Sequence, residues 1–223
     1  MIIVMYVAVV LIGYLLGSIP FGLWISQRIS GTDIRQVGSG KIGMTNVMRA
    51  AGKKAAAVAL LLDMAKGALA VILAGLIFRE NQNIAQTAAA LASVIGHNWS
   101  IFLKFKGGRG VATFVGSLFA LYWPIGLIGG ALILIIGFST RYMSLGSIIG
   151  AVTSFIMLMS LYVLQINLLG PYPPFEYVIF AMICAIFIYV RHRDNIVRLV
   201  SGTERKLGDK ATAVNSSSPG DNK

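Results

Sequence analysis

The sequence predicts an all-α integral membrane protein, and three observations support this class. The chain has 223 residues, of which 57% are hydrophobic, and its mean hydropathy is +0.78. Only 12% of the residues are charged, whereas a soluble domain carries about 25%. The apolar residues also occur in runs close to the roughly 17–25 residues that a helix needs to cross a bilayer.

We expect seven transmembrane helices, two of them short. The first apolar run has neither a basic start nor a small-residue cleavage site, so it is typical of a retained span rather than of a signal peptide. This run covers 2–27 and is broken near its end by Pro20. The other full spans are expected at 55–78, 84–103, 145–166 and 175–190.

The segment 111–138 decides the topology, because it contains a helix breaker at Trp123-Pro124. If it turns there and crosses twice, all the strongly basic connections lie on one side, as cytoplasmic loops do. Twenty-eight residues are short for two full spans, so we expect two short or tilted helices. Glycines that allow close helix packing are Gly110, Gly126, Gly129 and Gly130.

The distribution of Lys and Arg predicts the orientation. Segments 28–54 and 104–110 and the C-terminal tail are basic, whereas 79–83 has one arginine and 167–174 has none. We therefore expect the N-terminus outside and the C-terminus in the cytoplasm. The organisation predicted is one polytopic membrane domain over 1–204, followed by a polar, disordered cytoplasmic tail over 205–223.

The net charge of +11, from 19 Lys and Arg against 8 Asp and Glu, has several readings. Such an excess is typical of proteins that bind nucleic acid, anionic lipid or an anionic substrate, and topology alone also produces it. We expect no nucleic-acid partner, because the cations lie in loops tied to a bilayer. The single cysteine, Cys184, lies in an apolar run and is interpreted as a packed thiol.

The first polar segment with chemistry is GSGKIGMTNVMR, residues 38–49. Its glycines let backbone N–H groups approach an anion, and an arginine can clamp a phosphate with two hydrogen bonds. It lacks the GxxxxGK[ST] pattern of a nucleotide-binding loop. The alternative is a plain glycine-rich surface loop. The candidate phosphate ligands are Lys41, Thr45, Asn46 and Arg49, with Ser39 beside them.

The second segment is the turn FKGGRG, residues 105–110, which opens the next apolar helix. Free N–H groups and the helix dipole favour an anion at such a place. Candidate ligands are Lys106, Gly107, Gly108 and Arg109; the alternative is an ordinary basic cap between two spans. His97, about 10 Å deeper by helix rise, is interpreted as structural.

The third segment is RHRDNIVRLVSGTE, residues 191–204. His192 and Asn195 are spaced i, i+3 and are expected on one helical face. Imidazole exchanges a proton near neutral pH, and an amide can orient a hydroxyl. Within the second span, Asp63 and Lys66 have the same spacing. Buried charges in a bilayer are usually paired, so they form a structural pair or face the site.

Taken together, six motifs resemble the PlsY family, bacterial membrane glycerol-3-phosphate acyltransferases that use acyl-phosphate. The resemblance runs from about residue 6 to 204 and rests on GSIPFG, GSGKIGMTNVMR, LDMAKG, FKGGRGVAT, RYMSLGSI and RHRDNI…GTE in this order. It implies transfer of a fatty acyl group from acyl-phosphate to the 1-hydroxyl of sn-glycerol 3-phosphate. The products are lysophosphatidic acid and phosphate. It implies no acyl-CoA, metal or other cofactor, and a soluble partner that makes the acyl-phosphate.

The resemblance also implies residue roles. Ser39 and Arg49 match an essential serine and arginine, Ser144 matches a substrate-binding serine, and Glu204 closes the third motif. His192 and Asn195 match the pair at the reacting centre. Departures from the family pattern include Arg109 in place of lysine and Met44 in place of alanine. At 41, a lysine stands where asparagine is usual, which adds a phosphate contact or alters substrate preference.

Two other functions are compatible with parts of the sequence. A transporter of an organic phosphate would use basic glycine-rich loops and a buried Asp63–Lys66 pair, but carriers usually bind substrate near the midplane of the bilayer. A scaffold that binds anionic lipid leaves His192 and Asn195 without a purpose. The HxxxxD pattern of many acyl-CoA acyltransferases is absent, because Phe102 and Val197 stand five residues after the two histidines.

Overall fold

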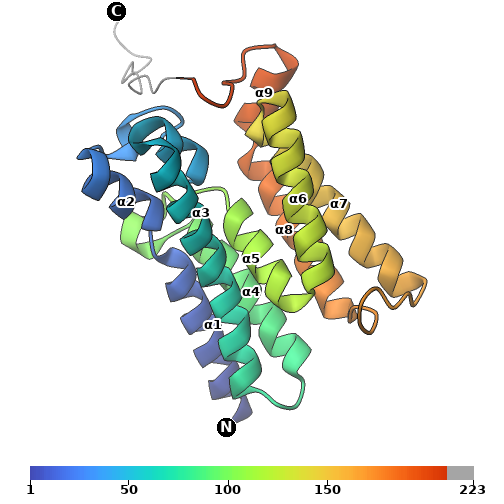
Figure 1. Cartoon of the computed structure of the whole chain (residues 1–223). Helices are drawn as coiled ribbons and strands as arrows, with labels where there is room; N and C mark the ends of the chain where they lie inside the picture. Colours follow the sequence, from blue (N-terminus) through green and yellow to red (C-terminus); the bar gives the residue numbers. More distant parts are fainter. Residues whose placement is uncertain (210–223) are drawn as a thin grey trace, which may run out of the picture.

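The computed structural model describes residues 1–209, and this part of the chain is helical without strands (Figure 1). The expected all-α class is therefore confirmed. Two short 3-10 helices, Ile34–Gln36 and Ile101–Leu103, lie in the connections. The α-helices are α1 (Ile2–Ser18), α2 (Phe21–Ser30), α3 (Met44–Ile77), α4 (Gln82–Asn98), α5 (Val111–Leu121), α6 (Trp123–Thr140), α7 (Met143–Val163), α8 (Phe175–Arg191) and α9 (Arg193–Val200).

Several of these helices have the length and composition of membrane spans. Among the described residues, α3, α6 and α7 meet this criterion, as does the α1–α2 stretch taken together. The pair α8 and α9, bent by 59°, is a fifth candidate. The helices α4 and α5 have 17 and 11 residues and are shorter. The protein is thus an integral membrane protein, while the count of seven spans and their orientation stay predictions.

Two predicted breaks are confirmed. The first run is interrupted between Ser18 and Phe21, where Pro20 lies. The segment 111–138 divides at Tyr122, and Pro124 occupies the first turn of α6. The two halves pack closely, because a Cβ at Gly126 would overlap the backbone of Phe119. The chain therefore forms two helices here, as expected, but only α5 is short, because α6 has 18 residues and is long enough to cross a membrane.

One boundary differs from the sequence prediction. Segment 28–54 was expected to connect two spans, yet α2 extends to Ser30 and α3 begins at Met44. Most residues after Met44 are good helix formers, and their positive charge does not prevent helix formation at a bilayer surface. The extension has a single irregularity at Gly52, with φ +86°, which bends α3. The basic segment therefore includes the first turns of α3.

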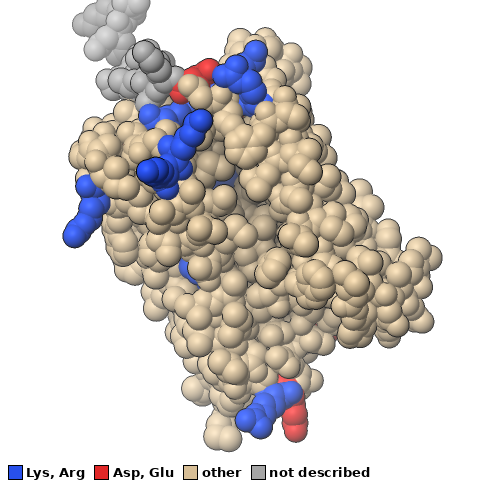
Figure 2. Space-filling view, viewed as in Figure 1, with Lys and Arg blue, Asp and Glu red and all other residues tan. Residues whose placement is uncertain are grey.

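The connections gather at the two ends of the bundle (Figure 1). One end holds the N-terminus, the α3–α4 turn and the α7–α8 loop. The other end holds the α2–α3 loop, α9 and residues 201–209. Figure 2 shows that the Lys and Arg side chains visible on this face lie mostly at the second end. The two ends therefore differ in charge as the sequence predicts.

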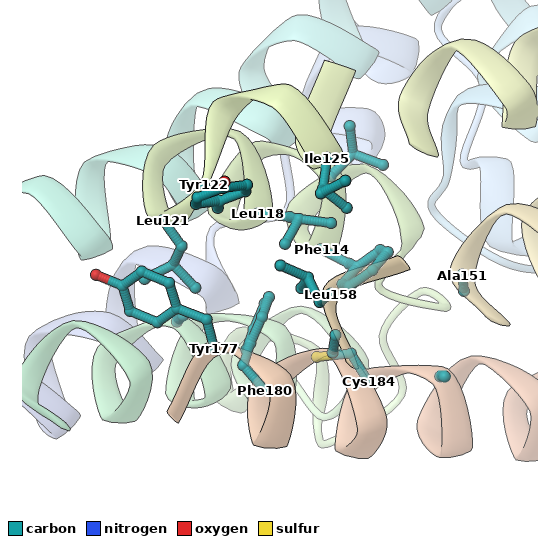
Figure 3. Packing of buried hydrophobic residues seen from close by; sticks show 14 of the residues in the cluster. Phe114, Leu118, Leu121, Tyr122, Ile125, Ala151, Leu158, Tyr177, Phe180 and Cys184 are labelled. Atoms are coloured by element: carbon teal, nitrogen blue, oxygen red, sulfur yellow. The ribbon is translucent and has the colours of Figure 1, made fainter. Parts of the chain in front are cut away.

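The main core lies between α5, α7 and α8 (Figure 3). Phe114 on α5 and Phe180 on α8 stack with their ring centroids 5.7 Å apart. Cys184 is fully buried in the same cluster, in agreement with its interpretation as a packed thiol. A second cluster packs the α2–α3 loop against α3 through Ile34 and Val47. This second cluster fixes the glycine-rich loop on the bundle.

Candidate active site

A cavity of about 390 Å³ brings together polar segments that are far apart in the sequence. It is bordered by the α2–α3 loop, by α3, α5, α6 and α7, and by the chain around α9. The predicted site residues that line it are Ser39, Lys41, Thr45, Asn46, Arg49, Asp63, Arg109, Ser144, His192, Asn195 and Glu204. The four predicted residues outside the lining are Lys66, Lys106, Gly107 and Gly108.

The glycine-rich loop is held in shape by Asn46. Its amide nitrogen donates to the carbonyls of Ile34, Val37 and Lys41 at 2.8, 3.0 and 2.9 Å. Its amide oxygen accepts a hydrogen bond from the backbone N–H of Ser39 at 3.2 Å. Because both ends of this amide are used within the protein, Asn46 places Ser39 at the cavity rather than offering its own donors to a ligand.

Among the charged side chains of the lining, cations outnumber carboxylates. Five cations and two carboxylates border the cavity, which leaves three more cations than carboxylates. Burial, and then the charges of Arg191 and Arg109, lowers the pKa of the Lys41 amine. Such a field attracts a phosphate. The cations are Lys41, Arg49, Arg109, Arg198 and Arg205, and the carboxylates are Asp63 and Glu204.

Two arginines in the lining have donors to spare. Within residues 1–209, the buried Nε atoms of Arg49 and Arg109 have no hydrogen-bond partner. Burial lowers the pKa of Arg109 to about 10, so this guanidinium is charged at neutral pH. A buried cation without a partner is costly, and a bound phosphate would satisfy both groups.

The turn after α4 places Arg109 in the cavity lining, whereas the N–H groups of its two adjacent glycines are hydrogen-bonded within the protein. Gly107 N–H donates to the Asn98 carbonyl at 3.2 Å, and Gly108 N–H donates to the His97 carbonyl at 2.9 Å. The expectation that these N–H groups face an anion is therefore not met, because the end of α4 uses them. The Lys106 side chain is exposed, so Arg109 is the cation that the turn places at the cavity.

His192 lies at the bend between α8 and α9 rather than within one helix. His192 and Asn195 were expected on one helical face; His192 instead caps α9 where the chain bends by 59°, and both side chains line the same cavity. The His192 Nδ1 lies 2.7 Å from the Ile188 carbonyl. A carbonyl only accepts, so Nδ1 carries the proton and Nε2 is left as an acceptor. Burial, followed by the charge of Arg109, lowers the pKa of His192 to about 4, and the ring is neutral at pH 7.

Glu204 organises the polar side of the cavity. Its Oε1 accepts hydrogen bonds from Ser144 Oγ at 2.8 Å and from Asn195 Nδ2, and Oε2 accepts from Arg198 Nε at 2.8 Å. Burial raises the pKa of this carboxyl, but the three hydrogen bonds outweigh burial and hold it below its ordinary value. Asn195 Nδ2 is thereby engaged, while its buried Oδ1 has no partner in the described chain and can accept a hydrogen bond from a hydroxyl.

A buried ion pair lies beneath the polar cluster. Lys66 Nζ is 2.8 Å from Asp63 Oδ1 and donates to the Ile19 carbonyl at 2.9 Å. Both side chains are 2% exposed. Lys66 therefore ties α3 to the end of α1, whereas Asp63 reaches the cavity. His97, which sequence reasoning assigned to structure, also lines the cavity, with Nδ1 3.7 Å from Asp63.

The cavity continues into an apolar groove between α3, α5, α6 and α7. Its walls are hydrocarbon, and two glycines of α6, Gly126 and Gly130, lie in the lining where α6 packs closely on α5. Such a lining accepts an alkyl chain, whose burial contributes about 0.8 kcal/mol per methylene. The lining residues here are Leu60, Met64, Val111, Val115, Phe119, Gly126, Leu127, Gly130, Ile133 and Leu134.

Some lining residues carried no usable signal in the sequence. Arg205 and Leu207 both border the cavity, although they fall in the segment predicted to be a disordered tail. Residues 205–209 are described and contact the bundle, whereas 210–223 lie outside the described residues. Only their tertiary contacts distinguish Arg205 and Leu207 from the other positions of the segment predicted to be a tail.

The apolar helices make this an integral membrane protein. Its cavity, cationic on one side and apolar on the other, has the chemistry of a site for phosphorylated lipids. The sequence model of the family described as glycerol-3-phosphate acyltransferase matches residues 7–202, and the chain belongs to this family. A glycerol-3-phosphate acyltransferase 3 of Dehalococcoides mccartyi strain CBDB1 is 47% identical over 222 residues, covering 95% of this chain and 100% of the relative. The glycerol-3-phosphate acyltransferase of Bradyrhizobium diazoefficiens is 46% identical, covering 90% of this chain and 94% of the relative.

Solved structures agree with this assignment. A crystal structure of PlsY (YgiH), an integral membrane glycerol 3-phosphate acyltransferase in its glycerol 3-phosphate form, is similar with TM-score 0.79 and 37% identity. The alignment covers 91% of this chain and 96% of that one. The lysophosphatidic acid form of the same enzyme gives TM-score 0.77 and 36% identity over 91% and 95% of the two chains.

Proposed function

We propose that this protein transfers a fatty acyl group from acyl-phosphate to the 1-hydroxyl of sn-glycerol 3-phosphate, giving lysophosphatidic acid and phosphate. The observation that carries the proposal is a shared cavity beside an apolar groove, in which the Nε atoms of Arg49 and Arg109 have no hydrogen-bond partner among residues 1–209. Similar solved enzymes are described in forms with the proposed acceptor and the proposed product. This places the reaction in phospholipid synthesis.

The neutral His192 and the hydrogen-bonded cluster of Ser144, Asn195 and Glu204 form the part of the cavity where glycerol 3-phosphate would bind. Within residues 1–209, no group bonds to the Nε2 of His192 or to the Oδ1 of Asn195, so both can accept a hydrogen bond from the attacking hydroxyl. Such contacts orient the hydroxyl towards the acyl carbonyl, which is a large part of the rate gain in transfer reactions. Because Glu204 holds Asn195 and Ser144, these groups are positioned before substrate binds. Ser39 approaches from the opposite loop.

The bond changes balance without another reactant. The hydroxyl oxygen forms a bond to the acyl carbon, and the bond from that carbon to the phosphate oxygen breaks. Arg49 and Arg109 stabilise charge on the carbonyl oxygen and on the departing phosphate. The hydroxyl proton passes to the leaving phosphate, either directly or by way of His192 Nε2. Lys41 adds a further cation to the same chamber.

The transporter alternative has less support. The polar lining comes from the α2–α3 loop and the chain around α9, which lie at one end of the bundle (Figure 1). Carriers usually bind their substrate near the midplane. A lipid-binding scaffold would leave the hydrogen bonds among Ser144, Asn195 and Glu204 without a purpose.

We also infer where the reaction takes place. The relatives are bacterial enzymes, and the chamber lies at the end with most Lys and Arg. By the rule that cytoplasmic ends are basic, the site faces the cytoplasm from the inner membrane. Acyl-phosphate would then come from a soluble enzyme at that surface, and its acyl chain would enter the groove from the lipid side.

The experiment is a transfer assay in detergent. Purified full-length protein is given labelled glycerol 3-phosphate and synthetic acyl-phosphate, and lysophosphatidic acid is measured. We expect product that requires both substrates and falls at least about tenfold in Arg109→Gln, since a charge-assisted hydrogen bond contributes about 1.5–3 kcal/mol. Absence of lysophosphatidic acid with folded wild-type protein would overturn the proposal, and vesicle uptake of glycerol 3-phosphate would favour the transporter.

A further inference from the structure

The residues that follow α9 form a strap across the polar mouth of the cavity. We call residues 203–209 the cover segment. It begins where Thr203 N–H donates to the Arg198 carbonyl at 2.8 Å. Three of its side chains, from Glu204, Arg205 and Leu207, line the cavity. The segment therefore belongs to the wall of the site, although it is not helical.

The cover segment is hydrogen-bonded to both sides of the cavity. On one side, Arg205 Nη1 donates to the Gly38 carbonyl at 2.6 Å, and Arg49 Nη2 donates to the Lys206 carbonyl at 3.2 Å. On the other side, Leu207 N–H donates to the Arg141 carbonyl at 2.7 Å, and Arg141 Nη2 returns a bond to the Leu207 carbonyl at 2.9 Å. The segment thus connects the glycine-rich loop to the α6–α7 turn.

Arg205 and Leu207 make different contacts: Arg205 is hydrogen-bonded to the glycine-rich loop, whereas Leu207 packs against apolar residues. The carbonyl that Arg205 holds belongs to Gly38, the residue before Ser39, so Arg205 fixes the loop that carries Ser39. Leu207 is half-buried, lines the cavity and packs against the main core. Its side chain lies where the polar chamber meets hydrocarbon. Glu204, the residue before Arg205, accepts the hydrogen bonds of Ser144 and Asn195.

We propose that Arg205 and Leu207 are positioning residues whose cover segment keeps water from the acyl-phosphate while the acceptor is aligned. The inference rests on the proposed function, because it concerns the fate of that donor. Acyl-phosphate is a mixed anhydride that water also attacks. In that side reaction a water oxygen bonds to the acyl carbon, the bond to phosphate oxygen breaks, and the proton goes to phosphate. Fatty acid then forms instead of lysophosphatidic acid.

The experiment measures how the donor is partitioned. Full-length wild type, Arg205→Ala and Leu207→Ala are given acyl-phosphate labelled in the acyl chain together with glycerol 3-phosphate. Lysophosphatidic acid and enzyme-dependent free fatty acid are both quantified. We expect the ratio of fatty acid to lysophosphatidic acid to rise at least about threefold in both variants. The KM for glycerol 3-phosphate should rise in Arg205→Ala, because the Ser39 loop is released.

Matched variants separate positioning from folding. Arg193→Ala removes a cation whose side chain is 81% exposed and outside the cavity, and its product ratio should equal that of wild type. Arg205→Lys and Leu207→Met should restore the ratio most of the way. Arg205 is exposed, so its replacement leaves the core intact.

Two outcomes would overturn the inference, and they are distinguishable. If wild type makes lysophosphatidic acid and both variants lose transfer and hydrolysis in parallel, with the ratio unchanged, the cover segment has only a structural role and the proposed function stands. If wild type makes no lysophosphatidic acid, the proposed function fails and the inference fails with it.

Discussion

His192 shows how the position of one residue sets its chemistry. Two helices meet at this residue, which places the ring in the wall of the cavity with little access to solvent. The bond to the Ile188 carbonyl determines the tautomer, and burial determines the charge. A neutral imidazole with a free Nε2 can accept a proton or a hydrogen bond from a hydroxyl.

The lowered pKa of His192 predicts a dependence of stability on pH. Between the ordinary value of 6.5 and the folded value of about 4, the unfolded chain binds a proton that the folded chain does not. Stability is therefore full above pH 6.5 and falls as the pH drops towards 4, by roughly 3 kcal/mol. Thermal unfolding in detergent should show a steeper loss for wild type than for His192→Gln. Parallel curves for the two proteins would contradict this assignment.

Sequence reasoning at the residue scale identified most polar residues of the cavity but not all of their roles. Asn46 and the glycine amides of the FKGGRG turn were expected to face a ligand, and both satisfy backbone groups instead. Hydrogen-bond partners depend on which carbonyls fold nearby, and residue type alone does not contain this. The place of His97 in the cavity was missed for a similar reason, since only packing shows that His97 on α4 lies beside Asp63 on α3.

The helix α3 combines a surface turn, a residue proposed to bind phosphate and a buried ion pair. Its first turns carry Arg49, and the Asp63–Lys66 pair lies farther along the same helix. Lys66 is shared with the end of α1 through the Ile19 carbonyl. One element thus positions part of the chamber and connects it to the first helix.

We predict that breaking this ion pair is costly. Asp63→Asn leaves a buried ammonium without its counter-charge and should lower the free energy of unfolding by about 3–5 kcal/mol. The double variant Asp63→Leu with Lys66→Met removes both charges and should recover most of the loss. Asp194→Asn, whose side chain is 73% exposed, serves as the control. Thermal unfolding in detergent measures all three, and a wild-type midpoint for Asp63→Asn would contradict the prediction.

Helices were predictable because hydropathy and breakers are local properties. Proline and the length limit of a span predicted the division near Pro124 without any tertiary information. The start of α3 was predicted too late in the chain, because a basic, alanine-rich segment is compatible with a helix as well as with a loop. The cover segment could not be predicted, since it depends on contacts such as Arg205 to Gly38 between residues 167 positions apart.

At the scale of the whole molecule, most of the positive charge lies at one end of the helical bundle. Its basic end contains the chamber, and the opposite end carries the α3–α4 turn with Arg79 and Glu80. The apolar groove extends from the chamber between the helices. A phosphate and a hydrocarbon chain can therefore be bound at once, each in its own environment.

The proposed orientation can be tested with single cysteines. The native Cys184 is buried and gives a low background. In intact cells, a membrane-impermeant maleimide should label Arg79→Cys from outside, whereas Arg193→Cys should react only after the inner membrane is permeabilised. Labelling of Arg193→Cys in intact cells, with Arg79→Cys protected, would reverse the orientation.

The central claim is that Arg49 and Arg109, 60 positions apart in the numbering, hold phosphate in one chamber. Calorimetric titration of glycerol 3-phosphate into purified protein in detergent tests it most directly. Arg49→Gln and Arg109→Gln should each weaken binding at least about tenfold through loss of a charge-assisted hydrogen bond, whereas Arg193→Gln, with the same change in net charge, should bind as wild type does. Wild-type affinity in folded Arg49→Gln and Arg109→Gln proteins would contradict the claim.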